Sequence, residues 1–388
     1  MKKYLKKIAY KVGLKPWNER WRWKEISLKP CDGYKGDVLL SYLTEPFFLK
    51  GKDYAQLEKR HTSHWECFQM AQTFLNLGYC VDVIHALNNR FVPKKDYSFF
   101  IDKYLNLERI GAALGGNCKK IMHIDGAHWM FQNKSEYERL LALQKRKGVV
   151  LPPIRQLQPN WGFEYADFAT ILGNSFTLST YSHVLKPMFR IPVTSQAVYP
   201  WQNKKYDLCR KNFLWLGSGG LVHKGLDITL DTFSALPDYH LTVCAPIHRE
   251  KAFEKAYYKE LYETPNIHTI GWVDVNSPEF IDIVNKCVGL IYPSCSEGQS
   301  GGVVTCMHAG LIPVISYESG VDVNDFGVIL EDCSSNTIKK TLQEISSLPT
   351  EKLAQMSRKA WEFARTNHTR EKFAEEYKKA ITQIIEHS

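Results

Sequence analysis

The segment from Ile291 to Ser316 combines residue types that can bind a phosphorylated sugar. An apolar run of strand length ends in a polar loop that carries one acid, Glu297. Two glycines, Gly301 and Gly302, then open a short stretch of small residues. A helix that begins on glycines presents unpaired N–H groups and the positive end of its dipole, and both attract phosphate. The neighbouring carboxylate can accept hydrogen bonds from sugar hydroxyls, so we predict a nucleotide-sugar site here.

A second segment, from Phe213 to Phe233, repeats the pattern of an apolar run that leads into a glycine-rich loop. The loop holds Lys224, a point charge suited to neutralising a diphosphate leaving group. Its glycines keep the loop open, so backbone amides could also contact an anion. The open part of the loop is Gly217, Ser218, Gly219 and Gly220.

Both segments resemble the donor site of the GT-B glycosyltransferases of family 4. Glu297-Gly298 matches the opening of the family signature. Its close is matched by Met307, Gly310, Pro313, Val314 and Ile315. A third segment, Asn266 to Val273, resembles the strand and turn that face the nucleotide base. A glycine-rich turn alone occurs in many doubly wound proteins, but three matches in the family's order favour the GT-B architecture.

The resemblance implies a role for each matched residue. Lys224 and the amides of residues 300–302 would stabilise the departing diphosphate, and Glu297 would hold hydroxyls of the transferred sugar. No cofactor is expected beyond the nucleotide-diphosphate sugar itself, a UDP- or GDP-sugar. The residues expected at the donor site are Gly217, Ser218, Gly219, Gly220, Lys224, Gly271, Trp272, Val273, Glu297, Gly298, Gln299, Ser300, Gly301, Gly302 and Thr305.

Two positions depart from the family pattern. The usual arginine of the glycine-rich loop falls on Ser218, and the second glutamate, which usually holds the ribose hydroxyls, falls on Thr305. A threonine can exchange one hydrogen bond but brings no charge. We therefore expect nucleotide recognition to differ in detail, and a binding protein that has lost activity stays an alternative.

A cluster of His123, Asp125 and His128 follows a predicted strand in the N-terminal half. The carboxyl end of a strand in a doubly wound sheet faces the crevice, so we expect these three near the anomeric carbon and the acceptor hydroxyl. Imidazole and carboxylate also suit divalent cations. We expect no metal, because the chain has no Asp-x-Asp and a lysine with a helix dipole needs none.

A second cluster lies just before the predicted helix 66–77 and consists of His61, His64 and Glu66. We place it on the acceptor side, where the resemblance to family 4 is loose. The acceptor is expected to be a glycan or a lipid-linked hydroxyl. The basic run 145–147 is either a contact for an anionic acceptor or a solvated helix end.

Apolar runs of strand length alternate with amphipathic stretches, and the pattern occurs twice, which predicts parallel sheets built from βαβ units. The first set is Val38–Leu43, Cys80–Ala86, Ser98–Ile101, Ile121–Ile124 and Phe168–Leu172. The second set is Phe213–Leu216, Tyr239–Ala245, Asn266–Gly271, Val288–Tyr292, Ile312–Ile315 and Val328–Leu330. We predict an α/β fold with two Rossmann-like domains, 1–203 and 204–365, a cleft between them, and a C-terminal helix in 366–388 that crosses back.

Bulk properties agree with a cytoplasmic protein. Ten cysteines show no Cys-x-x-Cys pair, and no apolar run is long enough to cross a membrane. Six lysines alternate with apolar residues in 1–15, a pattern that predicts either contact with an anionic membrane surface or a solvated helix face. A net charge of +9 allows nucleic acid as a partner, but no binding motif for it is visible.

The function predicted from the sequence is transfer of a sugar from a nucleotide-diphosphate donor, with retention at the anomeric carbon. A role in the synthesis of a surface polysaccharide fits the resemblance. Two alternatives stay open. One is a non-catalytic sugar- or nucleotide-binding protein, and the other is an isomerase that resembles the UDP-sugar 2-epimerases, which share the architecture.

Overall fold

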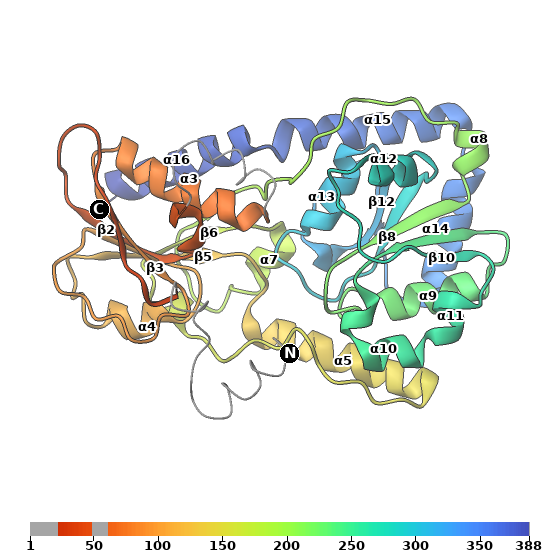
Figure 1. Cartoon of the computed structure of the whole chain (residues 1–388), viewed down its shortest axis with the longest axis horizontal. Helices are drawn as coiled ribbons and strands as arrows, with labels where there is room; N and C mark the ends of the chain where they lie inside the picture. The colour runs from red at the N-terminus through yellow and green to blue at the C-terminus, as the bar shows by residue number, and fades with distance from the viewer. Residues whose placement is uncertain (1–21, 49–60, 388) are drawn as a thin grey trace, which may run out of the picture.

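A computed structural model describes residues 22–48 and 61–387 and shows two α/β domains, each built on its own sheet (Figure 1). The basic start, residues 1–15, for which we predict either a membrane contact or a solvated helix face, lies outside the described residues. Within the described residues, no helix is both long and apolar enough to cross a membrane.

The first sheet has seven strands in the order β1-β3-β2-β4-β5-β6-β7, and only β1 runs antiparallel to its neighbour. Its strands are β1 (Ile26–Leu28), β2 (Asp37–Tyr42), β3 (Cys80–His85), β4 (Phe99–Asp102), β5 (Lys119–Ile124), β6 (Phe168–Ile171) and β7 (Met188–Arg190). Its helices are α3 (Thr62–Asn76), α4 (Asn106–Gly111), α5 (Trp129–Lys147), α6 (Gly162–Tyr165) and α7 (Ser175–Ser179). The central strands are buried almost throughout, as expected for parallel strands covered on both faces.

The second sheet has six parallel strands in the order β10-β9-β8-β11-β12-β13. They are β8 (Asn212–Leu216), β9 (His240–Cys244), β10 (Ile267–Thr269), β11 (Gly289–Tyr292), β12 (Ile312–Ser316) and β13 (Val328–Leu330). Its helices are α8 (Tyr206–Cys209), α9 (Leu226–Ser234), α10 (Lys251–Ala256), α11 (Tyr258–Tyr262), α12 (Pro278–Asn285), α13 (Gly301–His308) and α14 (Ser335–Ser347). This is the dinucleotide-binding order, whose direction reverses between β8 and β11.

Two C-terminal helices join the domains along one side (blue in Figure 1). Helix α15 (Thr350–Asn367) packs on α13 and β12 of the second domain. Helix α16 (Arg370–Glu386) packs on α3 and β6 of the first domain, where the ring of Phe373 lies 5.9 Å from that of Trp65. The predicted C-terminal helix that crosses back is therefore present.

Helix α5 also links the domains, because its C-terminal part lies against acids of the second domain. Arg146 pairs with Asp227 at 2.5 Å and with Asp231 at 3.0 Å, and Lys147 pairs with Glu260. The interpretation of 145–147 as a solvated helix end or an acceptor contact is thus wrong for Arg146 and Lys147. These two cations instead form ion pairs with acids of the second domain.

Candidate active site between the domains

The two segments singled out in the sequence follow β8 and β11, the strands at which the order of the second sheet reverses. Open α/β sheets bind ligands at this point, outside the carboxyl ends of the strands. Phe213 of β8 pairs with Gly289 of β11, so the loops after them leave the sheet side by side. A Cβ on Gly302 would lie 3.2 Å from the carbonyl oxygen of Leu216. The fold therefore joins the two predicted segments into one site.

Lys224 and Glu297 form an ion pair in the centre of this site. The Lys224 ammonium also donates to the hydroxyl of Tyr292 at 2.9 Å, and that hydroxyl donates to Glu297 Oε1 at 3.2 Å. Ser294 donates to the same oxygen at 3.3 Å. Glu297 Oε2 has no such partner among the described residues, which leaves it available to a ligand hydroxyl.

Both members of the pair are held in their charged forms. Burial alone would raise the pKa of Glu297, but Lys224, followed by Arg155 and His223, lowers it to about 2. Burial would lower the pKa of Lys224, but the Glu297 carboxylate raises it above its usual value. Glu297 is therefore a hydrogen-bond acceptor at neutral pH and not a proton donor.

His223, which the sequence analysis missed, ties the two loops together. Its Nε2 donates to the carbonyl of Ser296 at 2.5 Å, and its own carbonyl accepts from the amide of Cys295 at 2.9 Å. The ring is fully buried, and burial lowers its pKa. Its place beside Lys224 was a weak signal, because a histidine next to a site residue is more often structural.

Helix α13 begins at this site with free backbone donors. The Ser300 side chain makes no capping bond, and its amide donates to Ser319 at 3.0 Å. In the described part of the chain, the amides of Gly301 and Gly302 have no partner. A Cβ on Gly301 would meet nothing within 4 Å, so the helix start opens into free space and can receive an anion.

The glycine-rich loop after β8 offers fewer free amides than expected. The Glu250 carboxylate accepts from the amides of Gly220 at 2.5 Å and Leu221 at 3.2 Å. The amide of Gly217 donates to Cys244 of the neighbouring strand. The expected contact between this loop and an anion is thus limited to two amides that lack a partner in the described chain, those of Ser218 and Gly219.

Thr305, which stands where the family has its second glutamate, is buried, and its hydroxyl donates to the carbonyl of Gly301 at 2.8 Å. The turn after β10 places Trp272 on the surface, with 66% of the residue exposed. Gly271 enables this turn with a φ of +94°, a region that favours glycine. Val273 is buried behind it, so Trp272 projects from the turn as a flat apolar face.

The first domain contacts the Glu297 loop directly. A Cβ on Gly298 would lie 2.3 Å from the carbonyl oxygen of Asp125. Thr177 donates to the carbonyl of Gly298 at 2.9 Å, and the amide of Val193 donates to the Gln299 side chain at 2.7 Å. Gly298 and Gln299, both expected at the donor site, hold the two domains together here.

Asp125 lies at this junction with its side chain half-exposed and paired with Lys103 at 2.8 Å. Burial works to raise the pKa of Asp125, but Lys103 and, after it, His123 and Arg155 lower it. Burial is the largest cause of the lowered pKa of His61, which caps α3, and the charge of the same aspartate opposes that shift. The charges of Asp125 and His61 are therefore near enough to interact.

His123 has no exposed surface in this structure. Its Nδ1 is 2.8 Å from the hydroxyl of Thr170, and its ring lies between Tyr42 and Tyr377 of helix α16. Burial lowers its pKa to about 4. The structure brings Asp125 to the cleft but not His123.

His128 caps helix α5 and faces a cluster of its own domain. Its Nδ1 accepts from the amide of Met130 at 3.4 Å, and its Nε2 lies 4.0 Å from Glu164, which binds His183 at 2.7 Å. The three side chains offer possible metal-ligand atoms within 4.8 Å of one another. The capping bond places the proton of a neutral ring on Nε2, so that nitrogen could bind a metal only after a change of tautomer.

Glu66 is buried and accepts from the amide and the hydroxyl of Thr194, at 3.2 and 2.9 Å. Burial raises its pKa to about 7. His64 lies in the first turn of α3, partly buried. Glu66 thus joins α3 to the segment that leaves the first domain, which is a structural contact close to the cleft.

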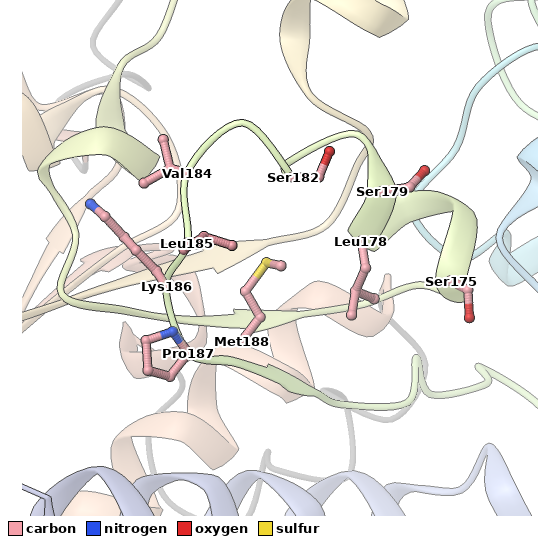
Figure 2. Close-up of a pocket in the computed structure, with 9 residues that line it drawn as sticks. All are labelled: Ser175, Leu178, Ser179, Ser182, Val184, Leu185, Lys186, Pro187 and Met188. Atoms are coloured by element: carbon pink, nitrogen blue, oxygen red, sulfur yellow. The ribbon is translucent and has the colours of Figure 1, made fainter.

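A groove of about 510 Å³ lies elsewhere on the first domain, between α7 and the chain that enters β7 (Figure 2). Its walls are mainly apolar, and Leu185 in them is almost fully exposed. None of the residues predicted for the donor or acceptor side lines it. The groove is therefore separate from the candidate site.

No family model and no curated protein matches this sequence. Several solved structures do match. Sucrose-phosphate synthase of Thermosynechococcus elongatus is 12% identical over 92% of this chain and 100% of its own, with a TM-score of 0.60. HepE of Anabaena, solved in complex with UDP and glucose, is 10% identical over 92% and 100%, with a TM-score of 0.54.

The chain has the GT-B fold. Identities this low show the architecture of two Rossmann-like domains and nothing finer. TarM of S. aureus also matches, at 12% identity over 72% of this chain and a TM-score of 0.46, and this chain spans about half of TarM's length (54%). What the GT-B site does in this chain must be argued from its own residues.

Proposed function

We propose that this protein transfers a sugar from a nucleotide-diphosphate donor to an acceptor hydroxyl in the cleft between its domains. The observation that carries the proposal is the ionised Lys224–Glu297 pair, beside the free amides that open α13. A cation, a carboxylate and a helix start at the reversal point of the sheet suit a ligand that is part anion and part sugar.

In the proposed reaction, the bond from the anomeric carbon to the donor's terminal phosphate breaks and a bond to the acceptor oxygen forms. The free amides of Gly301 and Gly302 would stabilise the negative charge that develops on the phosphate. Glu297 Oε2 would accept from sugar hydroxyls and fix the ring. The acceptor proton would pass to the departing phosphate, so this reaction needs no separate general base.

Finer features of the proposal rest on the family resemblance. It implies family-4-like transfer with retention, with Asp125 near the acceptor hydroxyl and a glycan or lipid-linked acceptor. HepE was solved with UDP and glucose, which supports UDP as the first nucleotide to test. The buried hydroxyl of Thr305 and the occupied amides of the glycine-rich loop favour one alternative, a protein that binds a nucleotide sugar without turnover.

The test is a thermal-shift screen of the full chain with UDP, GDP, ADP, CMP and dTDP and their common sugar conjugates, followed by product analysis. A ligand that binds only the folded state raises the melting temperature. We expect one nucleotide class to do so, and a Glu297→Gln variant to lose transfer while a Lys340→Ala variant, changed at an exposed lysine of α14, keeps it. No shift with any compound would refute the donor site.

The products separate the remaining possibilities. Transfer to an added acceptor supports the proposal. Conversion of the donor sugar to its 2-epimer without acceptor would indicate the isomerase, and binding without any product over a wide panel of acceptors would indicate the inactive protein.

A further inference from the structure

The candidate donor site needs a second cation, on the premise of the proposed function. The charge of Lys224 is already balanced by Glu297 at contact distance. A nucleotide diphosphate carries further negative charge, and its departure in the reaction adds to it. The second domain has Ser218 where the family resemblance places an arginine. The remaining charge must therefore be met from elsewhere.

Arg155, in the first domain, lies against the glycine-rich loop of the second. A Cβ on Gly220 would be 2.5 Å from Cγ of Arg155 and 2.9 Å from its Cδ. The φ of Gly220 is +86°, so this position requires glycine for two reasons. Its backbone conformation favours glycine, and a side chain there would collide with the Arg155 stem. The stem therefore crosses the domain boundary directly over the predicted phosphate loop.

The charge of Arg155 also acts on the residues of the site. It lowers the pKa of Glu297 and that of Asp125, the two acids that face the cleft from opposite domains. It opposes the protonation of His223 and Lys224 as well. The residue is exposed, and its guanidinium has no hydrogen bond or ion pair with any part of the chain that the structure describes. It is a free cation beside a neutralised pair.

The backbone around Arg155 is held in place by one face of α5. The buried carboxylate of Glu136 accepts from the amides of Ile154 and Arg155, at 2.9 and 2.8 Å. The buried Gln132 side chain donates to the carbonyl of Arg155 at 2.6 Å. Asn133 binds both backbone groups of Leu157, at 2.8 and 2.9 Å. A loop fixed at this many points is a built support and not an incidental surface turn.

We propose that Arg155 binds the diphosphate of the donor and supplies, from the first domain, the cation that the second domain lacks at Ser218. A guanidinium is always charged and offers a planar pair of donors that matches two phosphate oxygens. Because the residue belongs to the first domain, residues of both domains would contact the diphosphate, and this would shield the reacting bond from water.

The test compares the binding of UDP and UMP to the full chain by calorimetry, with GDP and GMP used instead if the screen selects guanosine. Arg155→Ala should weaken UDP binding about 10- to 100-fold, the range for hydrogen bonds to a charged group. UMP lacks the second phosphate, so the same substitution should weaken UMP binding by less than about threefold. Arg155→Lys keeps the charge without the paired donors and should fall between.

Gln158→Ala, an exposed change in the same loop, is the matched control and should bind UDP as the wild type does. An unchanged melting temperature for Arg155→Ala would show that the fold is intact. If the wild type binds none of the nucleotides, the proposed function fails. The role of Arg155 is refuted, while the proposed function stands, if the wild type binds UDP and Arg155→Ala binds it equally well. It is refuted also if the substitution weakens UMP binding as much as UDP binding.

Discussion

Replacing Glu297 by glutamine tests the buried pair at the centre of the site. Glutamine keeps the size of the side chain but removes its charge, so Lys224 is left without a counter-ion. The pKa of Glu297 is about 2 against 4.5 for an ordinary glutamate, and each pKa unit corresponds to about 1.4 kcal/mol. The variant should therefore lose about 3 kcal/mol in free energy of unfolding at pH 7.

The assay is urea unfolding at pH 7 of the wild type, Glu297→Gln, Lys224→Met and the double variant. Lys224→Met leaves the carboxylate buried alone and should cost a similar amount. The double variant removes both charges and should recover most of the loss, because a buried pair replaced as a whole is often neutral while a broken pair is costly. With each single variant costing about 3 kcal/mol and the double variant about 1 kcal/mol, the coupling energy between the two sites should be about 5 kcal/mol.

The pH dependence of this contribution has a fixed direction. A carboxyl whose pKa is lowered on folding stabilises the folded state above its unfolded pKa, here 4.5, and the contribution is lost as the pH falls through about 2. Glu297→Gln should therefore lose less stability than the wild type over that range. Single variants that cost under about 1 kcal/mol, as exposed pairs do, or two losses that simply add, would refute the reasoning.

Three further predictions concern other parts of the site. Burial raises the pKa of Glu66 to about 7, so its protonated form stabilises the fold below pH 4.5, and this stabilisation is lost as the pH rises through 7. In Glu66→Gln the urea midpoint should therefore depend less on pH over that range. The same pH dependence as in the wild type would contradict the prediction. Trp272→Ala should weaken UDP binding about tenfold by calorimetry if the ring stacks on the base, with no change in melting temperature because the residue is exposed. Gly298→Ala places a methyl 2.3 Å from the Asp125 carbonyl and should cost about 1–3 kcal/mol in urea unfolding, whereas Gly301→Ala, in open space, should not.

The sequence predicted every strand of the two sheets except two at the edges of the first sheet. Strands β1 and β7 have three residues each, none of them fully buried, so both are too short to show an apolar run or a sustained alternation. The order of strands in each sheet was not predictable, because it depends on pairings between distant segments. That order is what brings the loops of Lys224 and Glu297 together.

Site residues were predictable where a local sequence motif marks them. They were not predictable where the packing of the fold decides which way a side chain points. His123 lies in the strand run 121–124, whose residues are buried on both faces, so alternation could not reveal that its ring faces α16. His128 looked like a residue of the cleft, but its conformation is set by capping α5. Arg155 stands in a proline-containing loop far upstream of the loop it approaches, and no spacing rule connects the two.

Helix α5 limits how the cleft can open. The helix belongs to the first domain by its start, after Asp125, but its far end is anchored in the second domain through Arg146 and the fully buried Asp227. A rigid separation of the domains would break those pairs. If α5 instead stays with the second domain, the chain must bend just before the helix, at the loop that carries Asp125. Opening of the cleft would then move the Asp125 carboxylate away from the Glu297 loop. The movement that releases the products would therefore also separate the residues of the candidate active site.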